Sequence, residues 1–164
     1  MADPSSNAVN PLSQALGRVP SGLYILTVRH DGRATGLLAS WVMQAGFDPP
    51  MVTVAINSQR YVADWVSTSG RFTLNQLAAG NKPLIRHFGR GFPPDAPAFA
   101  GIELRDEGQG GPVLASASAF LEAEVVGEIA STDHRIFLAR VVGGAVLSPA
   151  SEPMVHTRNN GFHY

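Results

Sequence analysis

The chain has 164 residues, a net charge of −1 and no cysteine, and 45% of its residues are hydrophobic. This length predicts one domain with a sizeable core. The balanced charge argues against a nucleic-acid partner, and the missing cysteines exclude a disulfide framework, a thiolate zinc site and a cysteine nucleophile. No apolar run approaches the ~20 residues of a membrane span, and the N-terminus lacks a signal-peptide pattern. We therefore expect a cytoplasmic protein with no membrane partner.

Glycine and proline are frequent, with 17 and 12 copies. Such a high content of glycine and proline, which favour turns, is typical of many short strands joined by turns. We expect residues 1–13 to be a disordered tail and residues 14–164 to be the folded domain. Residues 11–16 can still form one short helix, which ends at Gly17.

Strand signals dominate the part of the chain that follows. The pair Asp31-Gly32 between apolar segments predicts a hairpin, which joins a strand at 23–28 to a return strand at about 34–43. After a turn at 47–50, the apolar run 51–56 predicts a strand that is buried on both faces.

Two helices are expected within this series of strands. Apolar spacing predicts the first at 61–66, and Asn81-Lys82-Pro83 opens the second, which runs to about Phe88. A short strand at 71–75 lies between them, a long loop covers 89–111, and long strands follow at 119–129 and 136–142. This order predicts a mostly β protein: a closed or split antiparallel barrel with inserted helices.

Several common sites can be discounted. The glycine-rich run 108–111 does not lie between a strand and a helix, so it is neither a P-loop nor a dinucleotide fingerprint. The five histidines lack H-x-x-x-H spacing, and we predict no metal site.

The turn between the buried strand and the first inserted helix is the strongest chemical signal. It carries Asn57, Ser58 and Arg60 at a helix N-terminus, where free N–H groups and a partial positive charge favour an anion such as phosphate. The alternative is that Ser58 only caps the helix and Arg60 is solvated. Asn75, at the end of a short strand, either forms a turn or hydrogen-bonds a ligand.

Five short motifs, taken in chain order, resemble those of the flavin reductase-like family. They are residues 18–27, residues 36–40 followed by Asp48-Pro49-Pro50, residues 70–77, Leu121-Glu122 and Asp133-His134. The resemblance covers about residues 14–164, and within the family it is greatest to the reductase domain of diflavin flavoproteins. It implies an FMN-binding split barrel of antiparallel Greek-key type.

The resemblance also implies a function. Members bind FMN without a covalent bond, form homodimers, and pass hydride from NADH or NADPH to the flavin and electrons onward; an electron-accepting protein is a further expected partner. By position, the residues that would line the flavin ring are Leu38, Ala39, Ser40 and Trp41. Those that would hold the phosphate are Asn57, Ser58 and Arg60. Those that would contact the ring edge or ribityl chain are Asn75, Gln76 and Leu77. His134 would lie where the nicotinamide arrives; the alternative is an ordinary turn histidine.

The second-strand motif departs from the usual family pattern. Leu38 and Trp41 replace a Thr and a Ser, so two hydroxyls are missing. Trp41 either stacks on the flavin or fills the space that a freely exchanging flavin needs. Two other functions stay open: a non-enzymatic FMN electron carrier, and a haem-binding split barrel. The candidate axial ligands of that haem are His87, His156 and His163.

Overall fold

The computed structural model describes residues 10–106 and 108–163. Helix α1 (Pro11–Gly17) opens this part of the chain, with Asn10 accepting hydrogen bonds from the first-turn N–H groups at its N-terminus. Residues 11–13 are thus part of the short helix that was expected at 11–16. Residues 1–9 of the expected tail lie outside the described residues.

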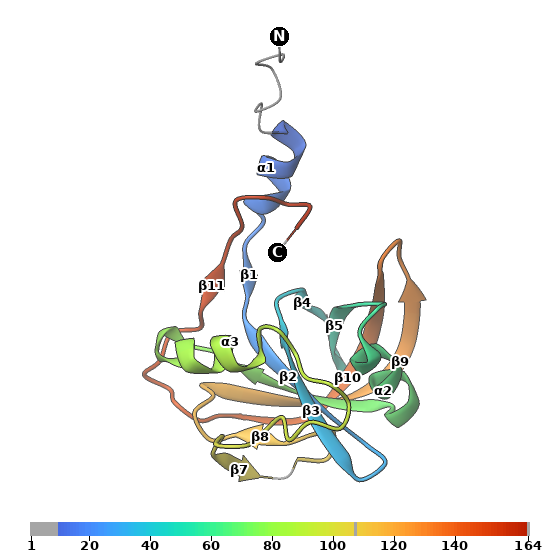
Figure 1. The fold of residues 1–164 in the computed structure, drawn as a ribbon, viewed down its shortest axis with the longest axis vertical. Coiled ribbons are helices and arrows are strands. Elements are labelled where there is room, and N and C mark those ends of the chain that lie inside the picture. The colour runs from blue at the N-terminus through green and yellow to red at the C-terminus, as the bar shows by residue number, and fades with distance from the viewer. Residues whose placement is uncertain (1–9, 107, 164) are drawn as a thin grey trace.

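A seven-stranded antiparallel sheet forms the body of the protein, in the order β3-β2-β6-β9-β10-β5-β4, and it curves into a barrel (Figure 1). The strands are β2 (Tyr24–His30), β3 (Arg33–Ala39), β4 (Val42–Phe47), β5 (Pro50–Asn57), β6 (Arg71–Gln76), β9 (Ala119–Ala130) and β10 (His134–Val146). The prediction of a mostly β antiparallel barrel is confirmed.

The barrel is split between its two edge strands, β3 and β4. These strands follow one another in the chain, yet β3 pairs with β2 and β4 pairs with β5. The chain crosses from one edge of the sheet to the other at Ser40 and Trp41. The single return strand expected at 34–43 is therefore wrong. Since residues 37–43 contain neither glycine nor proline, the sequence offers no local sign of the break.

Two other expectations about the strands have different outcomes. The hairpin at Asp31-Gly32 is confirmed, and both residues have left-handed φ angles of 49° and 73°. Strand β5 is not buried on both faces. Val54 and Ile56 lie in the core, whereas Thr53 and Ala55, which point to the other face, are only half-buried. One face of β5 is thus available to form an outer surface.

Two helices complete the hydrophobic core. Helix α2 (Tyr61–Ser69) packs Val62, Trp65 and Val66 into the main core of the barrel. Helix α3 (Lys82–Phe88) follows a 3₁₀ turn, η1 (Ala79–Asn81), and covers a second core outside the barrel with Leu84 and Phe88. Both predicted helices are confirmed.

The glycine-rich run is a packing element. A β-carbon on Gly111 would lie 2.5 Å from the carbonyl carbon of Thr27, so only glycine lets this segment lie flat on β2. The carbonyl oxygen of Gly110 accepts a hydrogen bond of 2.9 Å from the N–H of Arg29. Two short paired strands flank the run, β7 (Leu104–Asp106) and β8 (Val113–Leu114), so the predicted long loop contains structure of its own.

The two ends of the described chain meet in an arm that projects from the barrel (Figure 1). Strand β1 (Ser21–Gly22) pairs with β11 (Val155–His156), and the segment that follows, residues 157–163, runs beside α1. None of the helices within residues 10–106 and 108–163 is long and apolar enough to cross a membrane.

Candidate functional site

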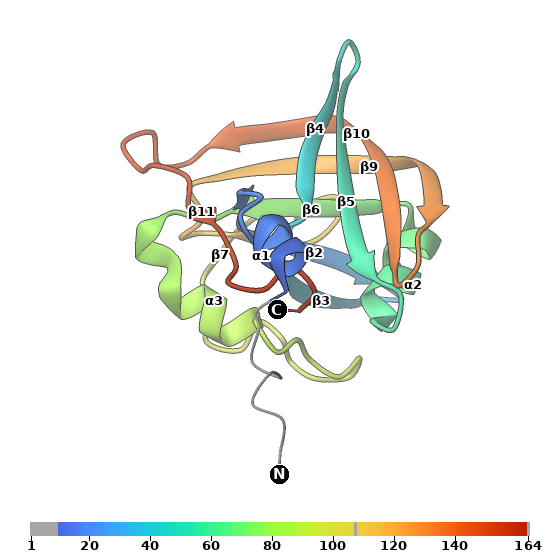
Figure 2. The same ribbon diagram turned by 90° about the horizontal axis from the view of Figure 1, so that it is seen from above.

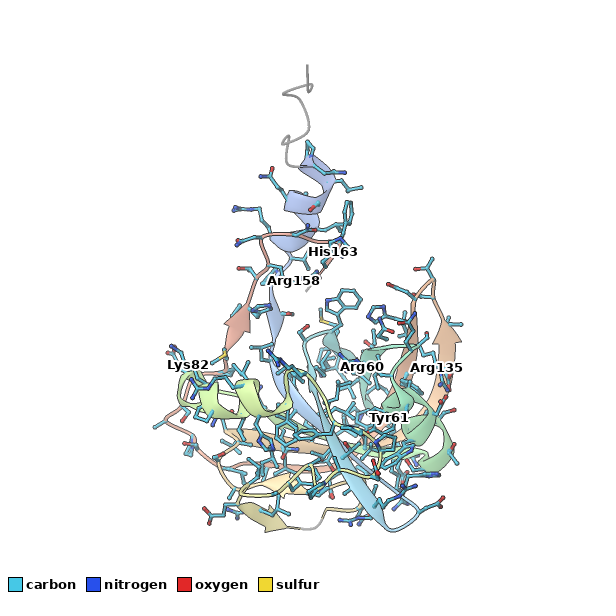
Figure 3. All side chains as sticks on the ribbon, viewed as in Figure 1. Arg60, Tyr61, Lys82, Arg135, Arg158 and His163 are labelled. Carbon is cyan, nitrogen blue, oxygen red and sulfur yellow. The ribbon has the colours of Figure 1, made fainter. Side chains whose placement is uncertain are left out.

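A pocket of about 470 Å³ opens where the barrel is split, between the edge strands and the arm. Its apolar floor comes from β3 and β5, through Leu37, Ala39, Ala55 and Ile56. Its polar barrel side consists of Ser40, Asn57, Arg60, Asp133 and His134. The arm supplies the opposite wall, with Arg158, Gly161, Phe162 and His163. In Figure 3, Arg158 and His163 lie on the arm above the barrel residue Arg60.

Three side chains form a stack in this pocket. The Trp41 and His134 rings are tilted with their centroids 4.6 Å apart, and the guanidinium carbon of Arg158 lies 5.3 Å from the Trp41 ring centroid. Trp41 is at the crossing between β3 and β4, so the split itself places its ring here. Such aromatic and guanidinium faces are suited to holding another flat ring.

The orientation of the His134 ring is fixed by the neighbouring residue, Asp133. The Nδ1 atom of His134 lies 2.7 Å from Oδ1 of Asp133, and since a carboxylate only accepts, Nδ1 carries the proton. His134 is buried, while Asp133 is exposed. This leaves Nε2 as the ring nitrogen that can act toward a ligand.

The same hydrogen bond holds the pKa of the Asp133 carboxyl below its ordinary value of 3.8. Because the folded-state pKa is the lower one, the contact contributes stability above that ordinary value and is lost as the pH falls through the lowered pKa. We expect His134→Ala to raise the pKa of Asp133 toward 3.8, measured by ¹³C NMR titration of the carboxyl carbon. An unchanged pKa in the variant would contradict this role of His134.

The N-terminus of α2 lies at the polar side of the pocket. Arg60 is its N-cap residue, and among the described side chains none caps this helix with a hydrogen bond. The alternative that Ser58 caps the helix is therefore wrong. The Arg60 guanidinium donates to the carbonyl oxygen of Arg90 at 3.0 Å, which holds it at the pocket, and the Ser58 N–H donates to the Asp133 carbonyl at 2.9 Å. Ser58 itself is exposed beside the pocket.

The pocket brings together most of the predicted site. Ala39, Ser40, Trp41, Asn57, Arg60 and His134 all line it. Four other predicted flavin contacts lie elsewhere: Leu38, Asn75, Gln76 and Leu77.

Each of these four side chains has another environment. Leu38 and Leu77 pack in the second core, and Leu77 is fully buried there. Asn75 is also fully buried and accepts a hydrogen bond of 2.8 Å from the N–H of Leu114. Gln76 lies beside Ser118, whose hydroxyl donates to it. Within the described chain, Asn75 and Leu77 are therefore buried in the interior, away from the pocket.

Sequence reasoning missed the arm as a wall of the pocket. The sequence suggested His163 only as an axial ligand of haem, and it predicted no role for Arg158 and Phe162. Their positions depend on contacts between residues 158–163 and residues 13–17. These two segments are separated by nearly the whole length of the chain, so no local pattern predicts their contact.

Comparison with known proteins agrees with this fold. A family model described as "Flavin reductase like domain" matches residues 16–163. Diflavin flavoprotein A 1 of Synechocystis sp. is 39% identical over 154 residues, which is 93% of this chain but 27% of that protein. The chain thus spans about a quarter of the length of such curated relatives.

Solved structures give the same picture. The NADH:FAD oxidoreductase SgcE6 of Streptomyces globisporus C-1027 is similar with a TM-score of 0.82 and 26% identity, over 96% of this chain and 92% of that one. The styrene monooxygenase flavin reductase of Pseudomonas putida S12 has a TM-score of 0.74 and 25% identity, over 88% and 90% of the two chains. With the family model covering nearly the whole chain, this protein belongs to the flavin reductase-like family.

Proposed function

We propose that this protein binds FMN in the pocket at the split and transfers hydride to it from NADH or NADPH. The observation that carries the proposal is a pocket that combines an aromatic stack with a cation at a helix N-terminus. A flat, phosphorylated ring system requires both features. Two structurally similar proteins, by name an NADH:FAD oxidoreductase and a flavin reductase, support this chemistry.

The residues of the pocket fit FMN. Arg60 at the N-terminus of α2 would hold the phosphate, and exposed Ser58 would add its hydroxyl at the mouth. Ala39 and Ser40 at the end of β3, together with the Trp41 ring, would hold the isoalloxazine. The cavity volume of about 470 Å³ is in the range of ligand pockets. When bound, FMN supplies the two-electron chemistry.

The chain's own residues then prepare the reaction. Trp41 and His134 stack on one side of the pocket, and Asp133 fixes the orientation of the imidazole. The nicotinamide ring would be guided to this side, with the Nε2 atom of His134 facing it. In this proposal His134 positions the donor. Correct orientation of two bound molecules contributes strongly to the rate of hydride transfer between them.

A homodimer is part of the proposal. Large apolar side chains are exposed on the outer face of β4 and β10, among them Met43, Leu138 and Val142. Met43, Thr53 and Leu138 lie in one row across β4, β5 and β10. Phe47, at the tip of the β4–β5 hairpin that extends beyond the other strands in Figure 2, is 89% exposed. Several exposed apolar side chains on one face of a sheet are typical of an interface. A further protein as electron acceptor and a cytoplasmic location stay predictions.

The direct test is to identify the bound cofactor. The purified protein should show a flavin absorption band, or gain one when FMN is added, and mild denaturation should release FMN. A protein that stays colourless with FMN would overturn the proposal. A Soret band lost on replacing His156 or His163 would indicate haem instead; His87 is less suited, because its Nε2 already contacts the Ala98 carbonyl at 2.7 Å.

His134→Ala should lower the rate of flavin reduction by NADH or NADPH at least tenfold and FMN affinity much less, because the proposal assigns the imidazole to the side where the donor arrives and the isoalloxazine contact to Trp41. Stopped-flow bleaching of the flavin band measures the rate, and fluorescence titration measures the affinity. An unchanged rate would remove His134 from the reaction. Slow bleaching already in the wild type would favour the non-enzymatic electron carrier.

A further inference from the structure

The chain has one asparagine that is followed by glycine, Asn160-Gly161, and this pair lies in the segment that runs beside α1 in Figure 1. An Asn-Gly pair is prone to deamidation, because glycine has no side chain to hinder the approach of its nitrogen to the preceding side chain. The described residues 157–163 form no helix or strand, so no ladder of hydrogen bonds restrains this backbone. Asn160 is also exposed to the water that the reaction consumes.

Packing against α1 explains why glycine occupies position 161. A β-carbon on Gly161 would overlap with the β-carbon of Leu16 and would lie 2.7 Å from the carbonyl oxygen of Ser13. Gly161 also lines the 470 Å³ pocket, so this close approach forms part of the pocket wall. The contact that builds the wall thus requires the residue type that makes Asn160 labile.

The docked arm holds both reacting groups. The N–H of Gly161 donates to the carbonyl oxygen of Ser13 at 2.7 Å, so the nitrogen that must attack is engaged. The Oδ1 atom of Asn160 accepts from the Ser13 hydroxyl and from the N–H of Phe162, each at 2.8 Å. Ser13 is buried, and it contacts the pair through both its side chain and its backbone. Separation of this segment from α1 therefore frees the nitrogen and loosens the carboxamide together.

We propose that Asn160 is a deamidation site and that docking of the arm on α1 sets the rate of the reaction. In the undocked arm the backbone nitrogen of Gly161 bonds to Cγ of Asn160, the bond from Cγ to Nδ2 breaks, and the N–H proton leaves with the amide as ammonia. The cyclic imide then takes up water and opens to aspartate or isoaspartate. The net change replaces an amide by a carboxyl without any transfer of electrons. This inference does not rest on the proposed function.

The two products have different consequences for the pocket. Isoaspartate adds a methylene group to the backbone before Gly161, which has no room to shift because it lies against Leu16 and donates to Ser13. The wall formed by Gly161, Phe162 and His163 would then separate from α1. Aspartate keeps an acceptor for the Ser13 hydroxyl and the Phe162 N–H, so it keeps the arm docked.

The test follows deamidation of Asn160 in the purified chain during incubation at mildly alkaline pH, by peptide mass spectrometry. It compares wild type, wild type unfolded in guanidinium chloride, Ser13→Ala and Gln14→Ala. Ser13→Ala removes the hydroxyl and keeps the carbonyl. Gln14 is the exposed next residue of the same helix, so its replacement is the matched control. Asn57, which precedes Ser58 in the turn after β5, is an internal reference in every sample.

Unfolding should speed deamidation of Asn160 at least tenfold, since the reaction then needs no local opening. Ser13→Ala should speed it about fivefold, Gln14→Ala should behave as wild type, and Asn57 should react alike in all folded variants. Equal rates for Asn160 in the folded and unfolded chain would overturn the inference. So would an unchanged rate in Ser13→Ala, or an equal acceleration of Asn57 in that variant, which would indicate general unfolding.

Hydrogen exchange then separates the two products. In the chromatographically isolated isoaspartate form, the N–H of Gly161 should exchange at least tenfold faster than in the unmodified chain. Asn160→Asp supplies the aspartate form directly, and its exchange should match that of wild type. Equal protection of Gly161 in the isoaspartate form and the unmodified chain would refute the separation of the wall, and fast exchange in Asn160→Asp would refute the distinction between the products.

Discussion

Replacing Arg60 by alanine weakens FMN binding by about tenfold to a hundredfold and leaves riboflavin binding nearly unchanged, because a hydrogen bond to a charged group contributes about 1.5–3 kcal/mol. FMN and riboflavin differ by the phosphate alone. The difference between their two losses therefore isolates the contact between the phosphate and the guanidinium, measured by fluorescence titration of each flavin.

The second partner of Arg60 requires a control. Its guanidinium also donates to the carbonyl oxygen of Arg90, so its removal can loosen the loop that begins at Gly89. Such loosening would affect both flavins alike. Arg90→Ala removes the exposed arginine side chain of this loop and keeps its backbone carbonyl. It should therefore leave the ratio of FMN affinity to riboflavin affinity unchanged. Equal weakening of FMN and riboflavin in Arg60→Ala would refute the phosphate role.

Asn75→Ala is expected to lower the free energy of unfolding by about 3 kcal/mol, since it leaves several buried polar groups without their partner. The Asn75 amide donates to the carbonyl oxygens of Ile25 and Pro112 at 3.2 and 3.3 Å, and its oxygen accepts the N–H of Leu114 at 2.8 Å. For a chain of 164 residues this corresponds to a fall in Tm of about 6–12 °C.

The flavin affinity of the folded Asn75→Ala protein should stay close to that of wild type. This outcome separates the structural role from the ligand contact that the sequence suggested. Ser118→Ala serves as a comparison, because its hydroxyl joins the same region through a neutral contact to Gln76 at 3.1 Å and its loss should cost about 1 kcal/mol. A stable Asn75→Ala protein with weakened FMN binding would restore the original interpretation.

Local patterns were sufficient to predict most of the fold. The left-handed pair Asp31-Gly32, the apolar spacing of α2 and the proline near the start of α3 each act over a few residues, and each is confirmed. The division of residues 34–43 into β3 and β4 was missed, because it is decided by pairing with distant strands and not by a turn signal. Burial of β5 was overestimated for the same reason.

The site could be predicted from the sequence only where local chemistry marked it. The turn that carries Arg60 follows a recognisable rule for helix N-termini, and it lies at the pocket. Polarity at a strand end was an unreliable signal: Asn75 is as polar as Asn57, yet the register of β6 directs it into the interior and the register of β5 leaves Asn57 half-buried at the pocket. Only the folded topology distinguishes these two asparagines.

The seven barrel strands end at Val146, whereas residues that line the pocket continue to His163. The C-terminal segment that forms one wall of the pocket is thus separate from the hydrogen-bonded strands that form the barrel. Substitutions at residues 158–163 can therefore alter the pocket without disturbing the backbone pairing of the barrel.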